Sequence, residues 1–250
     1  MPKHLLLYEY FNWKKPEFIH LPLILNKDKS KLSKRQNDVA VEDYINNGYL
    51  QGSIINYLAL LGWHSSGNRE IYSINELIEE FSIKRIQKSG SIFDVKKLNW
   101  MNNYYIKKLT SEEILFSSKQ YFPKGMNINQ KMIKLIHEKI ERLIDIPKEL
   151  NFFFNYELND QGFSIIEEQS SQQIFKELLF EIEKNQLWNS EQFKLMINNI
   201  QNRIKIKGKN LWMPIRLVLT GNLNGPNIGS IIEILGKDNC KKRILDQCND

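Results

Sequence analysis

Residues 209–236 read KNLWMPIRLVLTGNLNGPNIGSIIEILG, and this stretch decides the fold of the C-terminal half. Its apolar residues recur at helical intervals on both sides of a polar turn, and Pro214 stands at a first-turn position. Gly221 and Gly236 follow the two apolar segments, at the place where a helix commonly ends. The stretch therefore predicts two consecutive helices with no strand between them.

The same periodicity extends through the rest of the second half. Apolar residues recur at helical spacing in the segments 130–144, 171–184, 190–204, 214–220 and 228–235. Strand-like alternation is weak throughout this half, and no internal period of about 20 to 50 residues marks a solenoid. We expect the second half to be all-α.

The first half contains a strand signal near its start and helices after it. The expected elements, in chain order, are a helix over 5–11, a strand over 18–25, an exposed polar loop over 26–36, and helices over 41–47, 53–61 and 94–109. Ser73 with Glu76, and Thr110 with Glu113, have the spacing of capping boxes, which predict a helix start at each place. The whole chain is predicted to be mainly α.

Length and turn residues predict more than one domain. At 250 residues the chain reaches the size at which single hydrophobic cores stop growing. The segment Phe122-Pro123-Lys124-Gly125 has the composition of a connection between units. We therefore expect two units, or three, with a boundary at this segment.

Composition excludes some classes of protein. Hydrophobic residues make up 42% and charged residues 26%, the balance of a folded globular chain. No apolar stretch approaches the ~20 residues of a membrane span, and no secretory signal is visible, so we expect a cytoplasmic protein. Cys240 and Cys248 lack the partners of a zinc site, and no metal site is predicted. The net charge of +6 favours a polyanion but leaves RNA, DNA and anionic lipid open.

The polar loop is dense in cations. Five of them fall within nine residues: Lys27, Lys29, Lys31, Lys34 and Arg35. Such a cluster is self-repelling unless an anion lies among its members, and phosphate is the natural candidate. Ser33 adds a hydroxyl hydrogen bond. A solvated surface loop is the alternative interpretation of the same run.

Several ordered blocks of sequence resemble one family. The loop segment Lys31-Leu32-Ser33-Lys34-Arg35 resembles the KMSKS signature of class I aminoacyl-tRNA synthetases, in the form typical of bacterial glutamyl enzymes. Further blocks resemble the same family in the same order: 2–8 (PKHLLLY), 20–25 (HLPLIL), 56–63 (NYLALLGW), 93–100 (FDVKKLNW) and 209–235. The middle of the chain, roughly 111–207, matches only in helical character and spacing.

The resemblance implies a fold and a reaction. The implied fold is the end of a class I Rossmann-type catalytic domain with the KMSKS loop over residues 1–40, then a helical stem-contact region over 41–122 and an all-α anticodon-binding domain over 123–250. The implied activity is a glutamate–tRNA ligase of protein biosynthesis, which uses ATP and Mg²⁺ to form glutamyl-adenylate and then transfers glutamate to tRNA(Glu), with tRNA(Gln) as an alternative substrate. Lys34, assisted by Lys31, would be catalytic, and Lys31, Leu32, Ser33, Lys34 and Arg35 would bind ATP.

One feature of the family is missing from these 250 residues. The HIGH-type motif of class I synthetases is absent, as are the amino-acid-binding residues near it. We therefore expect a fragment or one half of a split enzyme, inactive without a separately supplied N-terminal half. A non-catalytic tRNA-binding remnant is the alternative. A DNA-binding protein is disfavoured because neither a helix-turn-helix nor a zinc signature appears.

A second basic run lies beside the block at 209–235. Arg203, Lys205, Lys207 and Lys209 alternate with apolar residues and Gly208, and cations in such a run suit RNA backbone phosphate. Arg216 is the fifth predicted tRNA-binding residue, with an internal ion pair as the alternative. Trp212 is more typical of a core residue than of a base-stacking surface.

Overall fold

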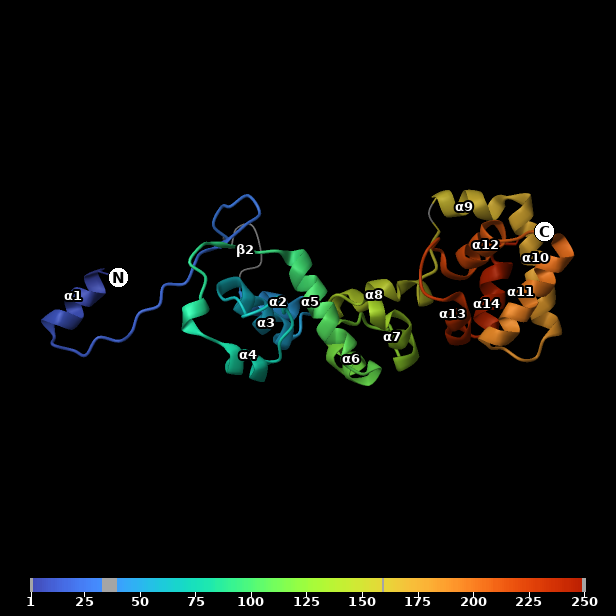
Figure 1. The fold of residues 1–250 in the computed structure, drawn as a ribbon. Helices are drawn as coiled ribbons and strands as arrows, with labels where there is room; N and C mark the ends of the chain where they lie inside the picture. Colours follow the sequence, from blue (N-terminus) through green and yellow to red (C-terminus); the bar gives the residue numbers. More distant parts are fainter. Residues whose placement is uncertain (1, 33–39, 159, 249–250) are drawn as a thin grey trace. The chain divides into compact units, whose positions relative to one another are not determined.

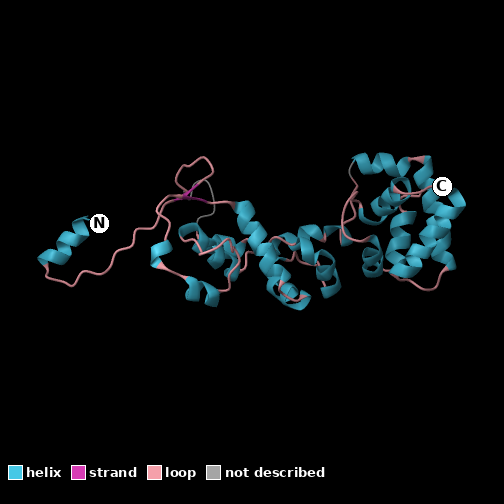
Figure 2. Ribbon diagram, viewed as in Figure 1, coloured by secondary structure: helices cyan, strands magenta, loops and turns pink. Residues whose placement is uncertain are grey.

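The computed structural model describes residues 2–32, 40–158 and 160–248. Helices dominate, and the sheet among these residues has two short strands (Figures 1 and 2). The mainly-α prediction is confirmed. The chain separates into two compact units, one of residues 1–44 and 51–101, the other of residues 45–50 and 102–250.

The first unit combines helices with the two-stranded sheet. Its elements are α1 (Pro2–Tyr10), β1 (Ile24–Leu25), α3 (Gln51–Gly62), α4 (Ile74–Glu80), η1 (Ile83–Arg85) and β2 (Ser91–Ile92). The helices α2 (Val41–Asn46) and α5 (Val95–Lys107) each run from one unit into the other. The expected helix near the start is present, and none of its residues is buried.

The strand expected over 18–25 is wrong in length. β1 pairs in parallel with β2, Ile24 opposite Ser91 and Leu25 opposite Ile92. A strand exists only where a neighbour accepts and donates ladder hydrogen bonds, and β2 is two residues long. The apolar residues before Ile24 are therefore not strand.

Aromatic residues form the centre of the first unit. Trp63 and Tyr72 are buried with their ring centroids 6.1 Å apart at 75°, and Leu77 of α4 packs with them. Edge-to-face rings add to the stability that their burial provides. Tyr57 joins α3 to the start of α5, because its hydroxyl accepts from the Asp94 amide at 2.6 Å.

Both predicted capping boxes are confirmed. The Ser73 hydroxyl accepts from the Glu76 amide at 3.3 Å, and the Glu76 carboxylate accepts from the Ser73 amide at 2.7 Å. Thr110 and Glu113 make the same reciprocal pair at the start of α6 (Ser111–Ser118). Arg69 also donates to the Glu76 carboxylate. Arg69 and the two Ser73 donors hold the pKa of Glu76 down, to about 2.

The lowered pKa of Glu76 predicts a pH-dependent stability difference. A carboxyl whose folded pKa lies below its ordinary value of 4.5 stabilises the fold above that value, and the effect is lost as the pH falls to about 2. We expect Glu76→Gln to lower Tm at pH 7 and the difference from the parent to vanish between pH 4.5 and 2. Thermal unfolding measured against pH tests this. Glu79→Gln, on an exposed neighbour, is the control, and equal profiles for the two variants would contradict the prediction.

The described residues of the second unit form helices and the loops between them, with no strand. Beyond α6 its elements are η2 (Lys119–Tyr121), α7 (Gln130–Ile136), η3 (His137–Lys139), η4 (Leu143–Asp145), α8 (Ile146–Glu149), η5 (Asn151–Phe153), α9 (Asp160–Glu167), α10 (Gln169–Lys184), α11 (Ser190–Ile204), α12 (Lys209–Thr220), α13 (Ile228–Leu235) and α14 (Lys237–Leu245). The helices α11 and α13 coincide with the predicted segments 190–204 and 228–235.

Two details of the predicted helices are wrong. The segment 130–144 is not one helix, because α7 ends at Ile136 and the backbone of Ile140 and Arg142 is extended. Within that extended stretch the carbonyls of Ile140 and Glu141 accept from Asn103 and Asn102 of α5, at 2.7 and 2.6 Å. Pro214 lies inside α12 rather than in its first turn. Leu211, fully buried, extends this helix before the proline.

The predicted domain boundaries differ from the division into compact units. A boundary was expected at Phe122–Gly125, yet the units divide after residue 101, and residues 45–50 join the second unit. The Tyr121 hydroxyl donates to the Ile45 carbonyl at 2.9 Å, and the Leu143 amide donates to the Gly48 carbonyl at 3.0 Å. These bonds attach 45–50 to the later residues. The three-domain division stays a prediction.

Two hydrophobic clusters stabilise the second unit. One contains residues between Ile106 and Leu150, and the other contains residues between Phe152 and Ile244.

None of the helices in the described part of the chain has the length and hydropathy of a membrane span. No group of three or more His, Cys, Asp or Glu side chains in that part is placed to hold a metal ion.

Candidate functional site

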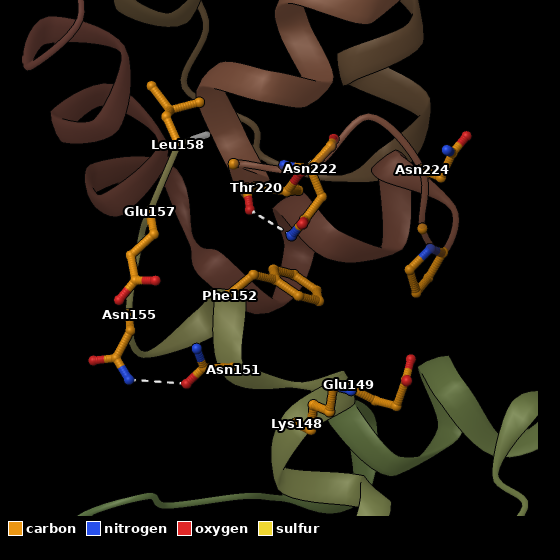
Figure 3. A pocket seen from close by; sticks show the side chains of 13 residues that line it. Lys148, Glu149, Asn151, Phe152, Asn155, Glu157, Leu158, Thr220, Asn222 and Asn224 are labelled. Carbon is orange, nitrogen blue, oxygen red and sulfur yellow. Dashed lines mark hydrogen bonds between the residues drawn. The ribbon is translucent and has the colours of Figure 1, made fainter. Parts of the chain in front are cut away.

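A pocket of about 460 Å³ lies within the second unit (Figure 3). One wall is the segment 148–158, which includes η5, and the other is the turn 220–226 between α12 and α13. Figure 3 shows the Phe152 ring extending between these walls. The pocket is therefore built from two segments more than 60 residues apart in the chain.

The turn at 220–226 is shaped by the end of α12. Gly221 has φ +71° and its amide donates to the Leu217 carbonyl at 2.7 Å. A Cβ at Gly221 would lie 2.1 Å from the carbonyl oxygen of Glu157, so only glycine permits this approach of the two walls. The Asn222 side chain donates to the Thr220 carbonyl at 3.0 Å. The predicted glycine end of this helix is confirmed.

The opposite wall is held by hydrogen bonds within it and to α12. The Asn155 side-chain amide donates to the Asn151 side-chain oxygen at 2.8 Å. The Tyr156 hydroxyl donates to the Leu217 carbonyl at 3.1 Å, and burial raises the pKa of Tyr156 to about 12. This phenol therefore stays protonated, and remains a donor, throughout the physiological pH range.

The lining is rich in neutral hydrogen-bonding groups. Four asparagines line it, Asn151, Asn155, Asn222 and Asn224, together with Thr220. Asn155 donates to Asn151 and Asn222 donates to the Thr220 carbonyl, and the remaining amide donors and acceptors can match the mixed edge of a neutral heterocycle. Lys148, Glu149 and Glu157 also line the pocket and are exposed. The pocket suits a polar planar group better than a bare anion.

The five predicted tRNA-binding residues fall into three situations. Arg203 forms ion pairs with Glu177 and Glu181 of α10, and Glu181 is 1% exposed. These hydrogen bonds raise the pKa of Arg203. Its charge is therefore compensated inside the unit.

The three lysines behave differently. Lys205, Lys207 and Lys209 are exposed, whereas the intervening Ile204 and Ile206 pack against the core. None of the ion pairs formed by the described residues includes these lysines. The connection between α11 and α12, together with the first residue of α12, thus presents three cations to solvent that take part in no ion pair among the described residues.

Arg216 lies behind the pocket turn. It is partly buried, and its Nη1 donates to the Pro226 carbonyl at 3.0 Å. A Cβ at Gly225 would lie 3.3 Å from the same nitrogen. Burial lowers the pKa of Arg216. The sequence allows either an RNA contact or an internal ion pair for Arg216. In the structure its side chain donates instead to a backbone carbonyl of the turn that forms the pocket wall.

The basic loop of the first unit is described up to Leu32. Lys31 forms an antiparallel bridge with Leu25, and the Leu32 amide donates to the Ile24 carbonyl at 3.0 Å. The predicted residues Ser33, Lys34 and Arg35 lie outside the described residues. Lys31 and Lys29 are exposed.

A tight turn precedes Lys31, and the cation count alone did not predict it. The Asp28 carboxylate accepts from the Ser30 amide at 2.9 Å and from its hydroxyl at 2.6 Å, and these bonds lower the pKa of Asp28. Asn26 closes the turn, since its amide donates to the Ser30 carbonyl at 2.8 Å. The Asp-x-Ser spacing is the signal that would have indicated this turn.

The asparagines of the pocket also went unrecognised in the sequence. They carry no charge and share no short motif, because the two walls are distant in the chain. Of the residues that line the pocket, the sequence indicates Gly221 alone, as the end of a helix within the block at 209–235. The signal for the rest exists only in three dimensions.

Comparison with known proteins identifies both units. Residues 95–248 match the model of the anticodon binding domain, and residues 1–100 match that of the catalytic domain of class I tRNA synthetases (E and Q). Glutamate–tRNA ligases of Clostridioides difficile and Finegoldia magna are 40% and 39% identical over 97% and 99% of this chain. The chain spans about half the length of these curated relatives, 52% in each case.

Solved structures agree with these matches. A glutamate tRNA ligase from Elizabethkingia meningosepticum, crystallised in complex with its amino acid, covers 98% of this chain with a TM-score of 0.85 and 29% identity. The glutamate–tRNA synthetase of Elizabethkingia anophelis gives a TM-score of 0.83 at the same identity. The chain covers 54% of each of those proteins. The chain therefore belongs to the glutamate–tRNA ligase family, matching a C-terminal portion that carries the anticodon-binding domain.

Proposed function

We propose that this chain is the anticodon-binding portion of a glutamate–tRNA ligase and supplies the KMSKS-type loop to its active site. The observation that carries the proposal is the match of 97% of the chain to such ligases, with the basic loop and the anticodon-binding domain on one polypeptide. In the proposed reaction the glutamate carboxylate attacks the α-phosphorus of ATP to give glutamyl-adenylate, and pyrophosphate leaves. A hydroxyl of the terminal ribose of tRNA(Glu) then takes the glutamyl group, and AMP leaves.

Within that reaction the basic loop would act on the phosphates. Lys31 and Lys34 would hold phosphate oxygens through their ammonium groups and stabilise the charge that develops as pyrophosphate leaves. Leu32, Ser33 and Arg35 would shape the same ATP contact. The exposed side chain of Lys31 supports this role. Among the described residues no group of three or more His, Cys, Asp or Glu side chains is placed to hold Mg²⁺.

The second half of the active site would come from the remainder of the ligase. The relatives are about twice as long as this chain, so the complete reaction is proposed for an assembly of both parts. ATP–pyrophosphate exchange tests this, with glutamate and tRNA(Glu) present. The chain is assayed alone and then mixed with the first half of the Clostridioides difficile ligase. Exchange in the mixture alone supports the proposal, whereas tRNA binding without exchange in either case favours a non-catalytic tRNA-binding remnant.

The pocket is proposed to hold an unpaired base of the anticodon loop. Sequence-specific RNA recognition takes splayed bases and hydrogen-bonds their edges, and the amide-rich lining of the pocket offers such groups. Lys205, Lys207 and Lys209 would bind backbone phosphate without reading sequence. Arg216 would support the turn beneath the base, and Arg203 is the weakest of the five candidates because Glu177 and Glu181 already pair with it.

The lysines give this proposal a measurable consequence. Removing three phosphate contacts from a single-stranded loop should reduce the slope of log K against log[salt] by about 2. We therefore expect the triple variant Lys205→Ala, Lys207→Ala, Lys209→Ala to bind tRNA(Glu) with that smaller slope and with lower affinity at low salt. Fluorescence titration over a range of salt concentrations measures both.

A matched control for the lysine variant is available in the same unit. Lys131, Lys134 and Lys139 are exposed on or beside α7, and their triple alanine variant makes the same change in net charge. It should leave the slope near that of the parent. If the salt slope falls by the same amount in both triple variants, the effect is one of net charge. Lys205, Lys207 and Lys209 are then not specific phosphate contacts.

A further inference from the structure

Arg243 of α14 connects the two walls of the pocket. Its Nη2 donates to the Phe152 and Phe153 carbonyls, at 2.8 and 3.1 Å, and its Nη1 donates to the Leu219 carbonyl. Phe152 belongs to one wall of the pocket, and Leu219 immediately precedes Thr220 of the other. Arg243 itself does not line the pocket. One side chain from outside the pocket therefore binds the backbone of one wall and the residue that leads into the other.

The acceptors of Arg243 are main-chain groups at the ends of helices. The last carbonyls of a helix have no helical donor and need another partner. At the end of α12, Leu219 receives its donor from Arg243. The Leu217 carbonyl, which already accepts from the Gly221 amide, also accepts from the Tyr156 hydroxyl. The guanidinium carbon of Arg243 lies 5.4 Å from the centre of the Tyr156 ring. The side chains of both residues thus bind the last turn of α12.

Only an arginine meets this geometry. The planar guanidinium directs its donors in fixed, diverging directions, so it can reach carbonyls on two different segments at once. A lysine has one ammonium at the end of a flexible stem and cannot span both sets. Burial lowers the pKa of Arg243, and every recorded hydrogen-bond acceptor of its guanidinium is a neutral carbonyl. The negative end of the α12 dipole partly offsets the cost of burying this cation.

We propose that Arg243 is a positioning residue that fixes the separation of the pocket walls and thereby sets the selectivity for the base held between them. The inference rests on the proposed binding of an anticodon base. Arg243 acts through Phe152 and through the Thr220–Gly221 end of α12. Its removal alters no direct contact with RNA and leaves the three lysines of the α11–α12 connection in place.

The test compares Arg243→Lys and Arg243→Met with the parent in the full chain. The dissociation constant is measured for tRNA(Glu) and for the same tRNA with its anticodon bases replaced. The preference for the native anticodon is the ratio of these two dissociation constants. We expect it to be about 10-fold smaller in both variants than in the parent, because the hydrogen bonds of one charged group are lost. Affinity for the substituted tRNA and the salt slope should stay at parental values. Lys242→Met, on the exposed neighbour in the same helix, should change nothing.

Hydrogen exchange separates this inference from the proposed function. In both Arg243 variants the amides of 150–158 and 219–224 should exchange faster, while those of α10 and α11 keep parental rates. A variant that is less stable yet retains the full anticodon preference would overturn the inference. A parent without any anticodon preference would overturn the proposed function. If the amides of both walls exchange at parental rates in the Arg243 variants, Arg243 does not position the walls.

Discussion

The Gly221→Ala variant is expected to lose about 3 kcal/mol of the free energy of unfolding of the second unit. Gly221 has φ +71°, where an L-residue costs roughly 1–2 kcal/mol. Its new Cβ would lie 2.1 Å from the Glu157 carbonyl oxygen, a backbone atom that cannot rotate away. The backbone must therefore move, at a cost of about 1–3 kcal/mol. Urea denaturation followed by circular dichroism measures the total.

A second glycine separates the two contributions at Gly221. Gly125 also has a positive φ, +87°, yet a Cβ there would have no atom within 4 Å. Gly125→Ala should therefore cost only the conformational part, about 1–2 kcal/mol. Equal losses in the two variants would mean that the walls of the pocket do not approach as closely as Gly221 and Glu157 indicate. Gly221→Ala should also weaken the preference for the native anticodon, because the displaced backbone is a pocket wall.

Asn102→Leu is expected to destabilise the second unit by about 3–5 kcal/mol. Asn102 is fully buried, and its side chain accepts from the Leu50 amide at 2.8 Å and donates to the Glu141 carbonyl at 2.6 Å. Leucine has a similar size but no polar group, so it would leave buried backbone groups unpaired, at roughly 1–3 kcal/mol each. These bonds also hold residues 45–50 in the unit. Calorimetry and urea titration measure the loss.

The neighbouring asparagine provides the control. Asn103 donates to the carbonyls of Ile140 and Glu138 at 2.7 and 3.2 Å, with one of these bonds exposed. Water can replace a partner there, so Asn103→Leu should cost about 1 kcal/mol. If the two leucine variants lose the same free energy, burial at residue 102 does not decide the effect.

Helix positions were largely predictable because the interactions that set them are local. The periodicity of 190–204 and 228–235 and the capping boxes at Ser73 and Thr110 involve residues three or four apart, and the structure agrees with all of them. The prediction failed where distant groups intervened. In place of the helix end expected near residue 144, the extended backbone at Ile140 and Arg142 bonds to amides of α5, and the short β2 limits the strand expected over 18–25.

The candidate site was predictable only in part. Charge and spacing pointed to Lys205, Lys207 and Lys209, which the structure leaves exposed, but they also pointed to Arg203. Nothing near Arg203 in the sequence indicates that Glu177 and Glu181, on another helix, compensate its charge. Ion pairing between helices depends on their packing, which charge spacing along one helix does not reveal.

By itself, the sequence determined the mainly helical fold, most helix limits and the family to which the blocks from Lys31 to Leu235 point. These properties depend on propensity, periodicity and short motifs, all of which act within a few neighbouring residues. Only the tertiary structure decided where the pocket lies and which side chains hold it open. Gly221 meets Glu157, and Arg243 reaches Phe152, across more than 60 residues of chain. Such contacts result from the packing of the whole unit, so they cannot be predicted from a local pattern of residues.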